Sequence, residues 1–199
     1  MPRNLTPAEV EDFRARLCDA AETLFARHGL DGVSLRQIAG EMGVSAMTPY
    51  RYFKDKDEVL AAVRTRAFDR FAAALEAASA LGGQGSAGAY VDFALRHPDA
   101  YRLMFDVTQP NTDDYPQLRA AIERARRTMR PNGAEARAGG EAAGSDELIG
   151  HVFWAALHGV IMLELAHKIS SRIDPTTLRK TLLEALGRGL GLETAAPAA

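Results

Sequence analysis

Cysteine is almost absent from this chain, which contains only Cys18 among its 199 residues. A single cysteine cannot form an internal disulfide, and it cannot supply the cluster of thiolates that a cysteine-rich zinc site requires. The sequence therefore indicates a protein that is not built for an oxidising compartment.

Long apolar runs are missing as well. Residues 1–11 contain no apolar core of about 7–15 residues, so no signal peptide is expected there. The most apolar stretch, 152–163, is interrupted by His158 and followed by Glu164, which leaves it short of the roughly 18–20 residues of a membrane span. These features predict a soluble, cytoplasmic protein.

Neither sign of charge is in large excess. The formal net charge is −2, and residues 1–60 hold eight Lys and Arg against ten Asp and Glu. A nucleic-acid-binding protein usually shows a basic footprint, so any such function has to rest on the local placement of charges. The 47% hydrophobic and 25% charged residues are typical of globular proteins and disfavour wholesale disorder or a fibrous repeat.

Helix signals recur along the whole chain, and strand signals are nearly absent, so we expect an all-α fold of about nine helices. Thr6, Pro7 and Glu9 form a capping box with proline at the first helical position, which predicts a helix over about 7–28. Further helices are expected from Ser34 to a glycine turn at Gly43, from 45 to about 53, from 55 to about 75, and over about 88–97, 98–107, 115–130, 146–170 and 175–190. Loops are expected at 79–88 and 132–144, followed by a frayed tail from 193.

Two short helices that meet at Gly43 are typical of a helix-turn-helix motif, in which the second helix enters the DNA major groove. Hydroxyl and cationic side chains that can bind phosphates follow the turn, among them Ser45, Arg51, Lys54 and Lys56. Met47 and Thr48 offer apolar groups for a thymine methyl. Spacing alone leaves a second interpretation open, namely a plain helical hairpin in a bundle.

Residues 13–60 closely resemble the N-terminal domain of TetR/AcrR-family transcriptional regulators. The residues that carry the resemblance are Ala20–Ala21, Leu24–Phe25, His28–Gly29, Val33–Ser34, Ile38–Ala39, Gly43–Val44–Ser45, Tyr50–Arg51–Tyr52–Phe53 and Lys56–Asp57–Glu58–Val59–Leu60. The resemblance implies a DNA-binding head at 7–54, a helical ligand-binding and dimerisation domain at 55–192 and a disordered tail at 193–199. It also implies a homodimer that represses transcription from a palindromic operator until a small molecule binds.

The same resemblance assigns the DNA contacts position by position. The predicted set is Ser34, Arg36, Gln37, Ser45, Ala46, Met47, Thr48, Tyr50, Arg51, Tyr52 and Lys54. Among these residues, Tyr52 and Lys54 are expected to hold phosphates. The chain departs from the family pattern at Pro49, which lacks an N–H donor and is therefore tolerated only in the first turn of the recognition helix.

The C-terminal half resembles the Trp-His-Gly (WHG) subgroup of the family, through 97–105 and through Trp154 followed by 157–159. Seven residues are candidates for an effector pocket, and a packed core is the alternative for each: Phe93, Tyr101, Met104, Phe105, Trp154, His158 and Met162. The effector is expected to be a small, largely apolar or aromatic molecule.

Apolar residues at helical spacing in the last two helices predict a dimer interface of four helices. They are Val152, Ala155, Ala156, Val160 and Leu163, with Leu178, Leu182, Leu186 and Leu190.

A metalloenzyme is the first rival function. Glu164 and His167 form one Glu-x-x-His pair, but a di-iron bundle needs two such pairs and two further glutamates. No catalytic motif, metal site or cofactor fingerprint is recognisable, so an enzyme is not expected. The other rival is an all-helical interaction protein without sequence-specific DNA binding.

Overall fold

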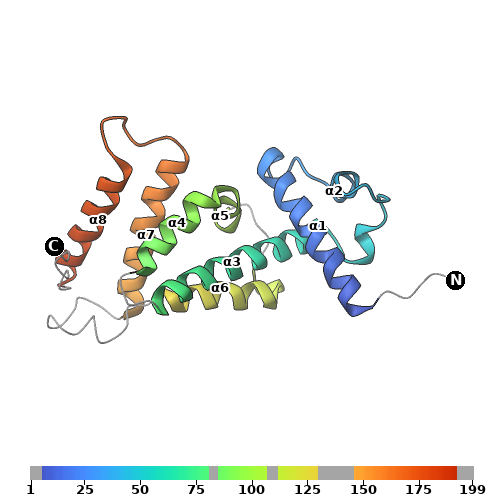
Figure 1. The fold of residues 1–199 in the computed structure, drawn as a ribbon, viewed down its shortest axis with the longest axis horizontal. Helices are drawn as coiled ribbons and strands as arrows, with labels where there is room; N and C mark the ends of the chain where they lie inside the picture. Colours follow the sequence, from blue (N-terminus) through green and yellow to red (C-terminus); the bar gives the residue numbers. More distant parts are fainter. Residues whose placement is uncertain (1–5, 81–84, 107–111, 130–145, 192–199) are drawn as a thin grey trace. The chain divides into compact units, whose positions relative to one another are not determined.

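The computed structural model describes residues 6–80, 85–106, 112–129 and 146–191, and these are all helix, turn or irregular segment without a strand. The expected all-α fold is confirmed. The helices, drawn in Figure 1, are α1 (Pro7–His28), α2 (Leu35–Glu41), the 3-10 helix η1 (Pro49–Arg51), α3 (Lys56–Ala80), α4 (Gly85–Arg96), α5 (Pro98–Met104), the 3-10 helix η2 (Thr112–Asp114), α6 (Pro116–Thr128), α7 (Asp146–Leu165) and α8 (Pro175–Gly189).

Local capping sets the ends of the first two helices as predicted. The Thr6 hydroxyl accepts the Glu9 N–H, and the Thr6 N–H donates to the Glu9 carboxylate at 2.8 Å. Ser34 and Gln37 repeat this reciprocal arrangement at the start of α2. Gly43 has φ +66°, a left-handed conformation that costs glycine little.

The predicted third helix over 45–53 is wrong as an α-helix. Residues 45–48 form a turn, and only Pro49–Arg51 are helical, in a 3-10 helix. Pro49 has no N–H with which to reach the Ser45 carbonyl, so that carbonyl accepts from Thr48 at 2.8 Å instead. The tighter 3-10 bonding then continues from Arg51 to Thr48.

Several later boundaries also differ from the expectation. Residues 79–80 still belong to α3 and α4 begins at residue 85, so the helices extend into both ends of the predicted loop at 79–88. Helix α7 ends at Leu165 rather than near 170, because His167 takes φ +54° and the Lys168 N–H turns back to the Leu163 carbonyl. This is a Schellman-type helix end. The predicted loop at 132–144 and the tail at 193–199 lie outside the described residues.

The chain divides into two compact units, which are described separately. The first comprises residues 1–73 and 97–125, and the second comprises 74–96 and 126–199. The core of the first unit joins residues of α1, α2 and α3 to a single residue of α5, Leu103. Of the residues that carry the family resemblance, Leu24, Phe25, Ile38, Ala39 and Phe53 are buried, and Val44 is half-buried.

In the second unit, α7 packs against α8 and also against α4, as Figure 1 shows. The sequence 147–165 on α7 has a mean hydropathy of 1.6, and among the described residues it is the one helix long and apolar enough to cross a membrane. Only 28% of this stretch is buried within the chain. The core helix of a soluble protein can be equally long and apolar, so one such helix is weak evidence for a membrane span.

Candidate DNA-binding surface and effector pocket

The segment after the glycine turn, residues 45–54, is anchored to the core by buried side chains. Pro49 and Phe53 are buried, and the Arg14 guanidinium lies 4.0 Å from the centre of the Phe53 ring. Arg14 also donates to the Tyr52 carbonyl and forms an ion pair with Glu58 at 3.7 Å. Sequence reasoning missed Arg14, although its position one turn after Val10 on the apolar side of α1 is a usable signal.

The outer side of this segment presents most of the predicted DNA contacts. Met47 is 68% exposed and Tyr50 is 52% exposed, which are high values for large apolar and aromatic side chains. Ser45, Ala46, Arg51 and Lys54 are exposed too, and Thr48 is half-buried. The structure therefore brings apolar, hydroxyl and cationic groups together on one short stretch of chain.

The three predicted contacts on α2 fall into two kinds. Ser34 and Gln37 are committed to the capping box, in which the Ser34 hydroxyl lies 2.7 Å from Gln37 Oε1. Arg36 is exposed and has no ion pair among those recorded for the described residues. Its guanidinium is therefore available to a phosphate or a base edge, and Ser34 and Gln37 primarily hold the start of the helix.

Tyr52 and Lys56 serve the packing of the head. The Tyr52 ring stacks on Phe13 with centroids 4.2 Å apart. The Lys56 ammonium donates to the Leu30 carbonyl at 2.9 Å, and this contact draws it away from solvent. Lys54 differs, because its ammonium makes only one ion pair within the described residues, a long one of 3.9 Å with Asp55.

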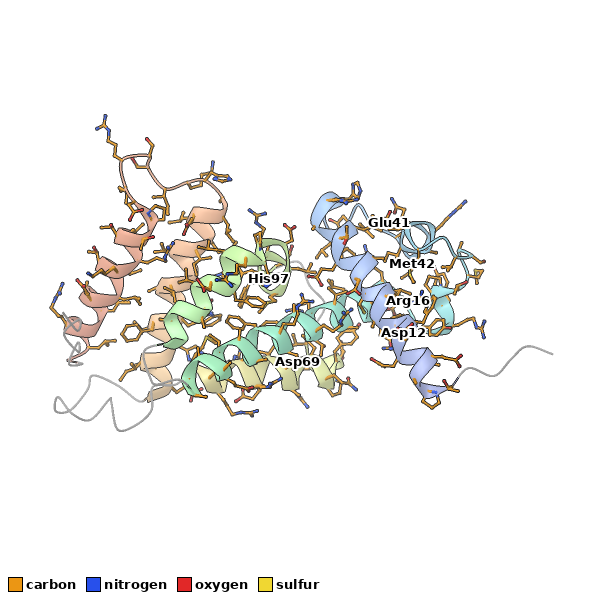
Figure 2. All side chains as sticks on the ribbon, in the orientation of Figure 1. Asp12, Arg16, Glu41, Met42, Asp69 and His97 are labelled. Carbon is orange, nitrogen blue, oxygen red and sulfur yellow. The ribbon has the colours of Figure 1, made fainter. Side chains whose placement is uncertain are left out.

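An open groove of about 410 Å³ runs beside the Phe13–Tyr52 pair. Its other lining residues are Ala8, Glu9, Asp12 and Arg16. Asp12 and Arg16, labelled in Figure 2, form an ion pair at 3.1 Å along α1. The lining holds two carboxylates against one guanidinium, so it carries one net negative charge and offers no positive charge to a phosphate.

Three of the seven pocket candidates lie in the first unit. Tyr101 and Met104 are buried on α5, and Phe105 is half-buried at its end. The Phe105 ring makes edge-to-face contacts with Tyr101 at 5.0 Å and with Phe68 of α3 at 5.8 Å. These residues form an aromatic cluster, which we call the α3–α5 cluster (Phe68, Tyr101 and Phe105).

The other four candidates lie in the second unit. Phe93 is buried, and Trp154, His158 and Met162 are half-buried on their helices. The Trp154 indole donates to the hydroxyl of Tyr90 at 3.1 Å, and its ring lies 6.2 Å from that of His158. Burial lowers the pKa of His158, which favours the neutral imidazole. Tyr90 was not predicted, although it lies one helical turn before the predicted Phe93.

The Glu-x-x-His pair does not come together as a metal site. Glu164 accepts a hydrogen bond from Arg179 of α8, and His167 lies in the left-handed turn that ends α7. Within the described ranges, no group of three or more His, Cys, Asp or Glu side chains is arranged to hold an ion.

The comparisons with known proteins agree with this geometry. The family model described as "Bacterial regulatory proteins, tetR family" matches residues 17–63, and the one described as "Tetracyclin repressor-like, C-terminal domain" matches residues 84–186. This chain belongs to the TetR family. It is a helix-turn-helix transcriptional regulator of that family and not an enzyme. Neither description names the WHG subgroup, so that finer assignment stays a prediction.

Individual relatives cover different shares of this TetR-family chain. A Haemophilus influenzae helix-turn-helix regulator is 42% identical over 65 residues, which are 33% of this chain and 35% of that protein. The regulator Rv0681 of Mycobacterium tuberculosis is 25% identical over 186 residues, covering 91% of this chain and 83% of that protein. The crystal structure of the regulatory protein SCO4313 superposes with a TM-score of 0.73 at 29% identity, covering 92% and 98% of the two chains.

Proposed function

We propose that this TetR-family regulator is a cytoplasmic, homodimeric repressor that binds a palindromic operator and leaves it when a small molecule binds. The head spans residues 7–54, and the remaining helices to 192 carry the effector and dimer contacts. The observation that carries the proposal is the exposed set around η1, above all Met47, Tyr50 and Arg51.

The chemistry of this set suits DNA. Exposed apolar side chains such as Met47 can contact a thymine methyl, while hydroxyls and cations hold phosphates. The turn and the 3-10 helix rest on buried Pro49 and Phe53, so the segment is ordered before it meets the groove. A pre-ordered segment loses less conformational entropy on binding.

The dimer is supported by the apolar surface of α7 and α8. Leu163 is 48% exposed and Ala155 is exposed, while Val152 and all four predicted leucines, at 178, 182, 186 and 190, are only half-buried. An isologous pairing of the two helices with their copies would cover this surface. The spacing of the two recognition segments then sets half-sites about one helical turn apart, roughly 10 base pairs or somewhat more.

The effector half of the proposal rests on the aromatic groups. Effector pockets are mostly apolar and hold a few convergent polar groups. Two groups qualify: the α3–α5 cluster in the first unit, and Trp154, His158 and Tyr90 in the second unit, which combine rings with hydrogen-bonding atoms. A small apolar or aromatic molecule matches these side chains.

Selection from a random DNA library at about 0.1–0.15 M salt tests the proposal, because specific binding must survive physiological screening. Enrichment of a two-fold-symmetric motif is the expected result. Weak, sequence-blind binding that appears only at low salt would contradict unaided operator recognition. Absence of binding at any salt would leave the interaction-protein interpretation.

A further inference from the structure

Arg64 of α3 is the only charged side chain that is buried among the described residues, with 6% of its surface exposed. Its Nη2 donates to the Met104 carbonyl at 3.2 Å. Its Nε and Nη1 atoms have no hydrogen-bond partner within the described part of the chain. A guanidinium carries five N–H donors, so most of its donor capacity is unused.

Other arginines on the same helix show how this chain ordinarily places such groups. Arg66 pairs with Asp19 at 2.7 Å, and Arg70 pairs with Glu22 at 2.8 Å. Both carboxylates come from α1. Arg64 instead contacts α5, where its hydrogen-bond partner is a backbone carbonyl. Arg64 is more deeply buried than Arg66 and Arg70. Its positive charge is also less well neutralised, because among the described residues it has no carboxylate partner of the kind that Arg66 and Arg70 have.

A buried, incompletely paired cation is costly to a folded protein. Burial lowers the pKa of Arg64, and the charge of Asp106 acts in the opposite direction. Arginine nevertheless keeps its proton in proteins. The cost would fall if an anion supplied acceptors for the unused N–H groups.

The surroundings of Arg64 suggest what kind of anion that is. Phe68 follows Arg64 by one helical turn on the same face of α3. It belongs to the α3–α5 cluster, where Phe105 contacts both Phe68 and Tyr101 edge to face. Aromatic surface beside a cation suits a molecule with an apolar body and one negatively charged group.

We propose that Arg64 is the anchor for a carboxylate on the effector, so that the effector is an organic acid with an apolar or aromatic body. This inference rests on the proposed function. It narrows the chemical class of the effector from an apolar molecule to an organic acid with an apolar or aromatic body. The carboxylate accepts the unused N–H groups of Arg64, and its body lies against the α3–α5 cluster.

The same arrangement connects the anchor to the DNA-binding head. Arg64 is bonded to the carbonyl of Met104, and the neighbouring Leu103 lies in the core that α1, α2 and α3 form. The Nε and Nη1 atoms are buried, so an acid reaches them only when the surrounding side chains move apart. Binding would therefore shift α5, and with it a residue of the head core.

The test compares acids with their uncharged amides on the full chain without DNA. Calorimetric titration and thermal unfolding use benzoate with benzamide and octanoate with octanamide, at constant ionic strength. We expect at least one acid to bind about tenfold or more tightly than its amide, as a hydrogen-bonded charge pair requires. Arg64→Met should abolish this preference, and Arg64→Lys, which keeps the charge, should retain part of it.

Arg70→Met is the matched control, because it removes one charge from the same helix and should leave the preference for the acid intact. Arg64→Met should fold with unchanged or higher stability, since it removes an unpaired buried charge. Equal binding of every acid and amide would overturn the proposal, and so would an acid preference that survives in Arg64→Met. A separate operator titration with the acid present tests the repressor mechanism: unchanged operator affinity for an acid that binds through Arg64 would contradict that mechanism and the effector role, while the carboxylate site at Arg64 would stand.

Discussion

The ring of Phe13 on α1 stacks on the ring of Tyr52, with centroids 4.2 Å apart and planes inclined by 23°. Tyr52 directly follows the 3-10 helix that carries Tyr50 and Arg51. The first helix is thereby joined to the end of the segment that is predicted to contact DNA, 39 positions further along the chain. The stack holds the end of this segment against α1.

Phe13→Ala should remove this stack. Because the ring is half-buried, we expect a loss of about 2 kcal/mol in the free energy of unfolding, together with weaker operator binding. Chemical denaturation and a DNA titration measure the two effects. Tyr52→Phe is the control, because it keeps the stack and removes only the hydroxyl. If Tyr52 holds a phosphate, this variant loses DNA affinity at unchanged stability.

Arg51→Ala should weaken DNA binding to all sequences alike. Each phosphate contact contributes about 0.9 to the slope of log K against log salt, and the dimer loses one contact in each subunit, so the slope should become shallower by about 1.8. Titrations at several salt concentrations measure this slope. Arg96→Ala on α4 removes an exposed charge outside the head and should leave the slope as it is. An unchanged slope for Arg51→Ala would remove this residue from the set of DNA contacts.

Met47 should read a thymine methyl in each half-site. Replacing that thymine by deoxyuridine removes only the methyl group, and we expect affinity to fall several-fold for the wild type. The variant Met47→Ala should bind the two DNAs equally. Competition titrations with uridine placed at each thymine in turn locate the contact. Equal sensitivity of wild type and variant at every position would contradict this role.

Leu163→Arg should break the dimer. Leu163 is 48% exposed on α7, and burying a charge in the predicted four-helix interface should weaken association by about 100-fold or more. Sedimentation at several concentrations measures the dissociation constant. Leu95→Arg is the matched control, since Leu95 is 37% exposed on α4 outside the predicted interface. A dimer that tolerates Leu163→Arg would place the interface elsewhere.

Stability should depend on pH through His158. Burial lowers its pKa in the folded state, so the unfolded chain binds a proton more readily and acid favours unfolding. The stabilisation that comes from burying neutral His158 is complete above the pKa of histidine in the unfolded chain, about 6.5. It is lost progressively as the pH falls below that value. Chemical denaturation at pH 7.5 and at pH 5.5 measures the free energy of unfolding. The difference between the two values should be smaller for His158→Gln than for the wild type. His151→Gln, at an exposed position on the same helix, should behave as wild type.

The helix starts, the glycine turn and the family of this protein were predictable from the sequence alone. Thr6 with Glu9 and Ser34 with Gln37 are capping pairs three residues apart, so the residues that form each hydrogen bond are close together in the sequence. Gly43 is predictable for the same reason, because its φ of +66° is a local property of the backbone. Motifs of this kind carry the family resemblance.

The tertiary structure alone decided which side chains are buried, and against what. Arg64 has the helical spacing of a core residue between Leu60 and Phe68. The sequence does not show that its Nε and Nη1 atoms lack hydrogen-bond acceptors among the described residues, because this depends on how α5 packs beside α3. Phe13 and Tyr52 likewise meet only after the chain has folded back. Such contacts join residues far apart in the sequence, and their energy depends on the packing of whole helices, which no local pattern encodes.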